Sequence, residues 1–121
     1  MGAKRSKVGE NVLKRSDYLN LLAKSKNKKR RNALIDVADK AEILAISECI
    51  ANALAGVLPL RATHINKMKK FKKKLRMISE RKVPNGKKKV LIKQTGGILA
   101  GILPLALSAV GSLVSSFLRP K

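Results

Sequence analysis

A chain of 121 residues has room for one small domain with tails, and its net charge of +21 is too large for an ordinary globular surface. Such a charge repels itself unless a polyanion or an anionic membrane compensates it. Cys49 and His64 are each the only residue of their kind, so no intramolecular disulfide is expected and a zinc site has almost no ligands. No arrangement of nucleophile, acid and base stands out, and we expect neither an enzyme nor a bound cofactor or metal.

The basic residues are concentrated in two segments. Residues 1–31 hold 11 basic and 2 acidic side chains and residues 61–93 hold 14 and 1, whereas the stretch between them has a net charge of −3. With the apolar end of the chain, this pattern predicts four parts. They are a basic arm with a short helix (1–31), a helical core hairpin (32–82), a basic linker ending in Gly-Gly (83–97) and an apolar helix (98–121). Within the linker, KKKVLIKQ (87–94) is expected to form either a short helix or an extended segment.

The basic arm contains helical patterns and one modification motif. SDYLNLLAK (16–24) predicts a short helix that Ser16 or Asp17 caps, and RRNALIDVA (30–38) predicts another. MGAKRS (1–6) fits the pattern for N-myristoylation at Gly2, with the neighbouring basic residues as the second signal that one acyl chain needs. The alternative is a chance match in a basic arm.

The middle of the chain predicts a helix over residues 39–55. Apolar residues recur there at spacings of three and four, which places them on one stripe: Ile43, Ile46, Ile50, Leu54 and Val57. Asp39 with Glu42 forms a pattern like a capping box, and Gly56 with Pro59 ends the helix.

A second, strongly basic helix follows. Its apolar residues step by four and three, and Thr63 is a plausible N-cap; the stripe consists of His64, Met68, Phe71, Leu75 and Ile78. The turn GVLPLR joins this helix to the preceding one as an antiparallel hairpin. No long alternation of period two predicts a strand. The fold class is therefore all-α, a small helical bundle with a helical hairpin, a basic N-terminal arm and an apolar C-terminal helix.

Runs of lysine and arginine predict a nucleic-acid interface. Phosphates bind such runs with release of counterions and without reading sequence. Base readout needs side chains presented to base edges, and single strands need aromatic platforms, both of which this lysine-rich chain lacks. The alternative is a solvated or membrane-facing surface. We predict contacts to the backbone of duplex DNA from Lys28, Lys29, Arg30, Arg31, Lys67, Lys69, Lys70, Lys73, Lys74, Arg76, Lys87, Lys88 and Lys89.

Residues 98–118 carry no charge and, as a helix, would be about 31 Å long, close to the thickness of a bilayer core. Small residues share one side of that helix and large apolar residues cover the other. A small-residue seam lets helices approach closely in lipid and form a homo-oligomer; it includes Gly101, Ser108, Gly111 and Ser115. We predict a membrane-active or transmembrane helix. The alternatives are a core helix of a soluble protein and a segment that stays sheltered until it is released.

QTGG (94–97) marks the start of the apolar segment. The same four residues end many mature SUMO proteins, where a cysteine protease of the Ulp class cuts after the second glycine. A protease tunnel that admits only glycine explains such a site. The motif predicts cleavage at Gly96-Gly97 by a Ulp-like cysteine protease, with a plain hinge as the alternative.

Several short motifs resemble small basic proteins of Polinton and adintovirus-type elements: AISECI (45–50), GVLPL (56–60), KKFKKKLR (69–76), RKVP (81–84) and KQTGG (93–97). The order of basic part, Gly-Gly and apolar tail is also similar to the precursor of the adenoviral core peptide mu. The resemblance implies a virion core protein that condenses DNA in the virion or the host nucleus. It also implies processing by the protease of the element itself.

Two functions from different classes follow from these patterns. The first is a DNA-binding and DNA-condensing virion core-type protein, without sequence specificity, whose membrane-active C-terminal segment is released by cleavage after Gly97. The second is a cationic membrane-inserting protein, lytic or anchored, with no nucleic-acid role.

Overall fold

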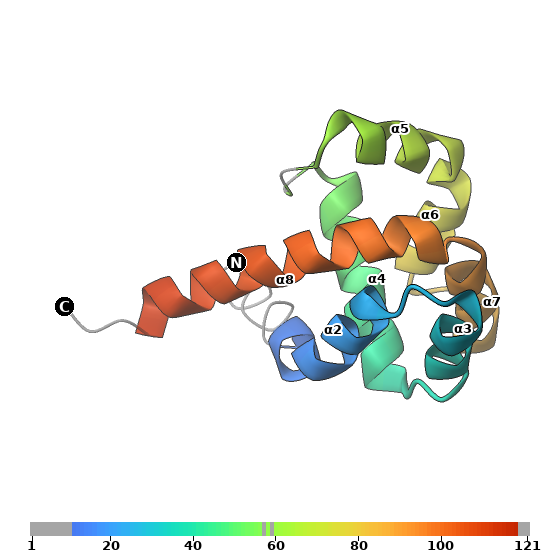
Figure 1. Cartoon of the computed structure of the whole chain (residues 1–121), viewed down its shortest axis with the longest axis horizontal. Coiled ribbons are helices and arrows are strands. Elements are labelled where there is room, and N and C mark those ends of the chain that lie inside the picture. The colour runs from blue at the N-terminus through green and yellow to red at the C-terminus, as the bar shows by residue number, and fades with distance from the viewer. Residues whose placement is uncertain (1–10, 57, 59, 119–121) are drawn as a thin grey trace.

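The apolar C-terminal helix runs through the middle of the molecule, and the other helices pack around its first half (Figure 1). The computed structural model describes residues 11–56, 58 and 60–118, with side chains only as far as Ser108 in the last helix. All regular structure in these residues is helical, which confirms the all-α class. The helices are α2 (Ser16–Lys24), α3 (Lys28–Asp36), α4 (Lys40–Leu54), α5 (Ala62–Lys70), α6 (Lys72–Ser79), α7 (Asn85–Gln94) and α8 (Gly96–Leu118).

Helix α4 matches the helix predicted over residues 39–55. The Asp39 carboxylate accepts a hydrogen bond from the Glu42 backbone N–H at 2.8 Å, and the Glu42 carboxylate accepts one from the Asp39 N–H at 2.9 Å. This capping box fixes the start of the helix. Gly56 follows its end with a φ of 77°, a left-handed conformation that glycine adopts without strain.

The second predicted helix is broken in two at Phe71. The Phe71 N–H donates to the carbonyls of both Lys67 and Met68, and its φ of −111° lies outside the helical range. On one side of the break α5 contacts α8, and on the other side α6 contacts α4. The predicted stripe still faces inward, because Met68 is buried on one side of the break and Leu75 and Ile78 are buried on the other.

Two predicted caps are wrong. Arg61, not Thr63, occupies the N-cap of α5, and no side chain caps that helix. Arg15, not Ser16 or Asp17, precedes α2, again without a side-chain cap. The chain is already helical before Arg15, whose N–H donates to the Asn11 carbonyl, so the first turn of α2 already has partners for its donors.

The segment predicted as a basic linker is largely helical. Residues 85–94 form α7, which packs against α3 and α6. Leu91 and Ile92 anchor it in the core. Helix α7 then meets the first part of α8 at 99°, and Thr95 stands at the corner with its hydroxyl donating to the Leu91 carbonyl at 3.0 Å.

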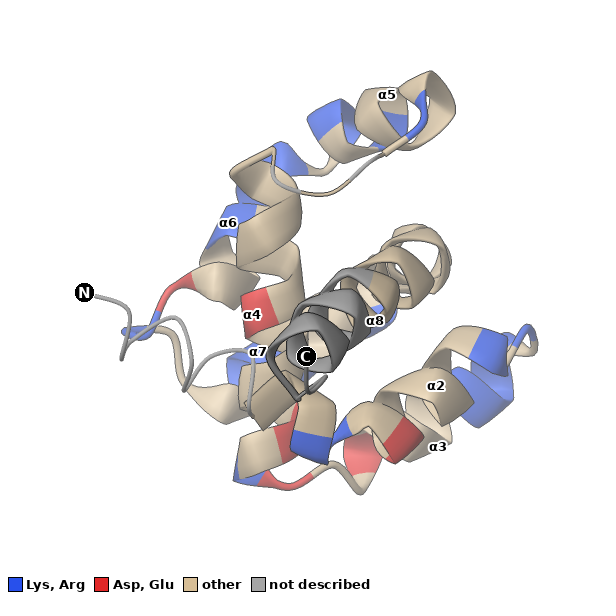
Figure 2. Cartoon of the chain, turned by 90° about the vertical axis from the view of Figure 1, so that its left-hand side faces the viewer, with Lys and Arg blue, Asp and Glu red and all other residues tan. Residues whose placement is uncertain are grey.

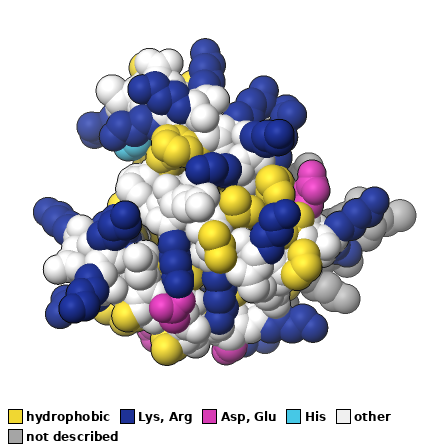
Figure 3. Space-filling model, turned by 90° about the vertical axis from the view of Figure 1, so that its right-hand side faces the viewer, with side chains coloured by type: hydrophobic (Ala, Val, Ile, Leu, Met, Phe, Trp, Pro, Cys, Tyr) yellow, Lys and Arg dark blue, Asp and Glu magenta, His cyan; other side chains and the backbone are white. Residues whose placement is uncertain are grey.

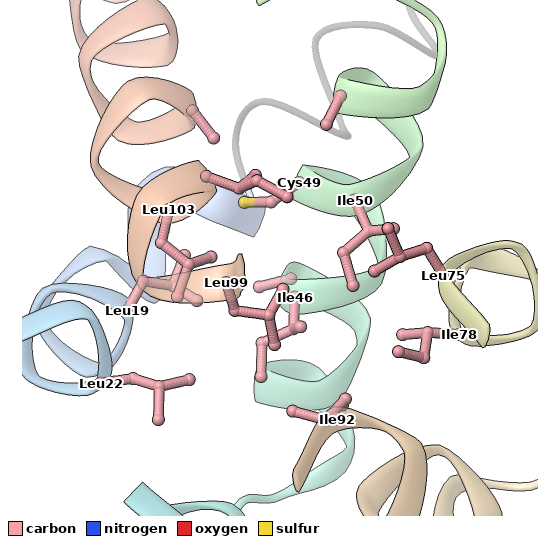
Figure 4. Close-up of a cluster of buried hydrophobic side chains, with 14 of the residues drawn as sticks. Leu19, Leu22, Ile46, Cys49, Ile50, Leu75, Ile78, Ile92, Leu99 and Leu103 are labelled. Carbon is pink, nitrogen blue, oxygen red and sulfur yellow. The ribbon is translucent and has the colours of Figure 1, made fainter. Parts of the chain in front are cut away.

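The first half of α8 is the core helix of this bundle, which was one of the alternatives for the apolar segment. Its large apolar side packs mainly against α2 and α4. The thiol of Cys49 lies in the same core, and burial raises its pKa to about 12. Figure 4 shows the side chains that meet there: Leu19, Leu22, Ile46, Cys49, Ile50, Leu75, Ile78, Ile92, Leu99 and Leu103.

The small residues of α8 lie on the opposite side of the helix. Pro104 and Ser108 are exposed, and Gly101 lies beneath His64, where an added Cβ would come within 2.8 Å of the imidazole Nε2. The glycine therefore lets α5 approach α8 within the monomer. Gly111 and Ser115 lie outside the described side chains, so the rest of the predicted seam stays a prediction. The backbone of α8 continues beyond the other helices (Figure 1).

We predict that Leu103→Ala lowers the free energy of unfolding by about 2–5 kcal/mol, because Leu103 is fully buried and the substitution leaves a cavity. Leu44→Ala is the matched control, since Leu44 is 45% exposed on α4 and its truncation should cost less than about 1 kcal/mol. Urea denaturation of the full chain measures both. Equal losses for the two variants would show that α8 is not part of the core.

Candidate nucleic-acid interface

Helix α3 lies beside the consecutive helices α6 and α7 on the right-hand side of Figure 1. Helix α7 is in the middle and contacts both α3 and α6. Each of them begins with a run of cations: KKRR in α3, KKK in α6 and KKK, after Asn-Gly, in α7. None of the three has an acidic residue in its first turn. Three helices that each begin with a run of cations therefore pack next to one another.

This arrangement is unfavourable for the isolated protein. The N-terminus of a helix carries partial positive charge, so acidic residues are favoured there and cations are disfavoured by about 0.3–1 kcal/mol each. Of these three helices, only α3 has a capping side chain: Asn27 accepts hydrogen bonds from the N–H groups of Lys29 and Arg30. An anion placed near these helix starts would interact favourably with both the side chains and the helix dipoles.

Most of the predicted DNA-binding residues are on this side and exposed. We define the basic face as the exposed basic side chains of α3, α6 and α7: Lys28, Lys29, Arg30, Lys72, Lys73, Arg76 and Lys87. Lys67, Lys69 and Lys70 extend it along α5 and are also exposed. Figure 3 shows lysine and arginine side chains spread over this side, with few acidic ones among them.

Lys72 was not among the predicted residues. It lies in the same KKK run as Lys73 and Lys74, which was the signal available in the sequence. The break at Phe71 makes Lys72 the first residue of α6 and leaves it exposed. Lys74 is half-buried, with its ammonium 5.7 Å from the centroid of the Phe71 ring, so it supports the packing of the broken helix as well as the charge.

Lys88 is a correction to the predicted interface. It shares the inward stripe of α7 with Leu91 and Ile92, and only 5% of its surface is exposed. Its ammonium donates to the Ser47 hydroxyl at 3.4 Å, and burial lowers the pKa of this lysine. A side chain held in this way cannot reach a phosphate. Helical spacing alone indicated the inward position, but a lysine in a basic run is normally exposed.

Arg31 and Lys89 join elements of the face to one another. The Arg31 guanidinium donates to the carbonyls of Ser25 and Lys26 at 3.1 and 2.9 Å and so caps the end of α2. The Lys89 ammonium donates to the Asp36 carbonyl at 2.9 Å. Lys93 forms a salt bridge with the Asp36 carboxylate, so the acidic residue of α3 is already paired. These contacts hold α3 against α7.

The acidic residues lie mostly away from the basic face. Figure 2 shows red segments on α4, near α2 and at the end of α6, in a view of the opposite side.

Glu48 of α4 is half-buried, and burial raises its pKa to about 7. In the part of the chain that the structure describes, no group of three metal-ligating side chains comes together.

The predicted cleavage motif forms the corner between α7 and α8. Gly96 is buried beneath Arg31, where an added Cβ would lie 2.9 Å from the guanidinium Nε, and Gly97 is exposed. Both glycines belong to the first turn of α8, whereas a protease tunnel requires an extended chain. Cleavage of the folded protein therefore requires local opening of the corner. The predicted lipidation site, Gly2, lies outside the described residues.

Within the part of the chain whose side chains are described, no single helix is long and apolar enough to cross a membrane. Helix α7 and residues 96–108 reach that length and composition only as a bent pair.

No known protein family, curated protein or solved structure matches the chain. The resemblance to Polinton and adintovirus-type proteins therefore stays a hypothesis.

We predict opposite effects from two neighbouring substitutions in α7. Lys88→Met should raise the free energy of unfolding by about 1 kcal/mol or more at neutral pH, because it removes a buried charge, and should leave DNA affinity unchanged. Its gain should shrink as the pH rises toward 10.5, the ordinary pKa of lysine, since the charge is then lost in both states.

Lys87→Met is the matched control. Lys87 is exposed, so this variant should weaken binding to duplex DNA and change stability by less than about 0.5 kcal/mol. Urea denaturation and fluorescence anisotropy with a labelled duplex measure the two properties. Weaker DNA binding by Lys88→Met than by Lys87→Met would contradict the assignment of Lys88 to the core.

Proposed function

We propose that this protein binds and condenses duplex DNA without sequence specificity, through the backbone phosphates. The observation that supports this most directly is that three helices packed next to one another each begin with a run of cations. Such an arrangement opposes folding of the isolated chain and favours binding of a polyanion. Lysine predominates on the basic face, which suits phosphate contacts better than base readout.

The size of the basic face sets the expected strength of binding. It consists of seven exposed basic side chains, before those of α5 are added. Proteins that neutralise about 6–10 phosphates lose roughly 10³–10⁵ in affinity between 50 and 200 mM salt. The resemblance noted above adds the more specific proposal of a virion core-type protein, located in the virion or the host nucleus.

The membrane-active role of the C-terminal segment is part of the same proposal. The large apolar side chains of α8 up to Ala106 are buried in the bundle, so this half can enter a membrane only after leaving the core. Cleavage after Gly97 would divide the core between two chains and so favour that release. The second candidate function, a cationic membrane-inserting protein without a nucleic-acid role, is favoured by the length and hydropathy of α8.

The intact mass of the native protein tests the two processing proposals. A chain that ends at Gly97 would support cleavage, and a myristoyl group would support lipidation of Gly2. A native chain that always runs unmodified from its first residue to Lys121 would contradict both.

We predict that the full chain binds unrelated duplexes of equal length with affinities that agree within about threefold. We expect log Kd to rise linearly with log salt concentration, with a slope of about 5 or more, because each neutralised phosphate contributes about 0.9 to it. Anisotropy titrations over a series of KCl concentrations measure both. The triple variant Lys72→Gln, Lys73→Gln, Arg76→Gln should lower the slope by about 2–3.

The matched control replaces three residues outside the basic face: Lys14→Gln, Lys24→Gln and Lys40→Gln. It removes the same charge, so a general effect of net charge would lower the slope equally. Equal slopes for the two triple variants, or no binding to any duplex at low salt, would overturn the proposed interface.

A further inference from the structure

An apolar groove lies where the end of α4, the connection after it and α5 meet, at the top of Figure 1. It has a volume of about 300 Å³, near the lower limit for sites that hold small molecules. Its walls are almost entirely hydrocarbon and come from Ala53, Leu54, Leu58, Leu60, Ile65 and Met68.

The groove leaves apolar surface in contact with water. Ile65 is 42% exposed, which is unusual for isoleucine, and Leu60 is only half-buried. The bundle could cover these side chains by closing α5 onto α4, but α5 instead packs against α8. The groove is thus a consequence of the break at Phe71, which directs α5 away from α4.

Two cations border this apolar surface. Lys69 of α5 and Lys72 of α6 belong to the lining, and none of the described lining residues is acidic. The site therefore combines a short apolar channel with a positive edge. The chemistry complementary to it is a hydrocarbon chain that ends in an anionic group.

Other occupants fit less well. A second copy of the chain has a net charge of +21, so its approach to this positive edge is opposed by repulsion. DNA supplies the anionic group but no hydrocarbon chain to displace water from Ile65 and Leu60. An acyl chain with a carboxylate supplies both.

We propose that this groove binds a single fatty acid, with its chain along Leu54, Leu60 and Ile65 and its carboxylate between Lys69 and Lys72. This site shares Lys72 and Lys69 with the basic face and its extension along α5, but it goes beyond the proposed DNA-binding function, because its specificity depends on an apolar groove that phosphate contacts do not use. It gives the protein an amphiphile ligand in addition to a polyanion.

Titration calorimetry of the full chain with monomeric dodecanoate, at an ionic strength of about 0.15 M, tests the proposal. We expect one dodecanoate per chain. Each added methylene should strengthen binding about fourfold from octanoate to decanoate to dodecanoate, as for burial of a CH₂ group. Dodecanol, which lacks the carboxylate, should bind at least tenfold more weakly.

Two groove variants separate the charge from the hydrocarbon. The double variant Lys69→Gln, Lys72→Gln should weaken dodecanoate binding about tenfold or more and leave dodecanol unaffected, whereas Ile65→Ser should weaken both. Lys70→Gln and Leu21→Ser are controls, because both residues are exposed and neither lines the groove. These two variants should leave the binding of dodecanoate and of dodecanol unchanged.

Circular dichroism checks the fold of each variant, and the lysine variants keep the test valid if Ile65→Ser fails to fold. The proposal is overturned if dodecanoate does not bind or binds several molecules per chain. It is also overturned if Lys70→Gln weakens binding as much as the double variant does, which would indicate general attraction to a basic protein.

Discussion

Repulsion among 28 lysine and arginine side chains, against only seven acids, opposes any compact state of this chain. The fold counters it with one continuous apolar contact, between the large side chains of α8 and those of α2 and α4. With two phenylalanines, one tyrosine and no tryptophan, few large side chains are available to replace that contact. The positions of the other helices follow from it, because α5 and α7 also pack against α8.

Most lysine and arginine side chains lie outside the core, and the positions of several of them lower the stability of the folded state. The starts of α3, α6 and α7 carry lysines and arginines against the direction that helix dipoles favour. Lys88 is buried in addition, with a serine hydroxyl as its partner instead of a carboxylate. Single substitutions would remove these features. A polyanionic partner of the kind we propose would offset their cost by stabilising the folded state on binding.

Burial of α8 also links the two properties that the sequence indicated. The large apolar side chains of the first half of α8 hold the bundle together, so they are not available to a bilayer while the chain is folded. One folded molecule therefore could not perform both of the proposed functions at once. Cleavage or opening at the Thr95 corner would convert the folded bundle into a state in which α8 has left the core. The hydroxyl of Thr95 and the close contact of Gly96 with Arg31 hold that corner in the folded state.

Features with local causes were predictable from the sequence. The capping box at Asp39 and the glycine at position 56 fix α4 through contacts within a few residues, and both were recognised. The break at Phe71 depends on which helices α5 and α6 contact, which no local pattern records. Lys88 was assigned to the surface because its residue type outweighed its helical position. The apolar run of α8 was predicted to be a membrane helix, with a core helix as one alternative, because periodicity alone does not distinguish the two.

Hydrogen exchange of the full chain with and without duplex DNA tests the central claim most directly. That claim is that the starts of α3, α6 and α7 are destabilised by their own cations and are stabilised together by phosphates. The account predicts fast exchange of the first-turn amides of these three helices in the free protein. It also predicts clear protection of all three on addition of any duplex, with a smaller relative change in α4. Protection confined to the arm before α2, with the three helix starts unchanged, would contradict it.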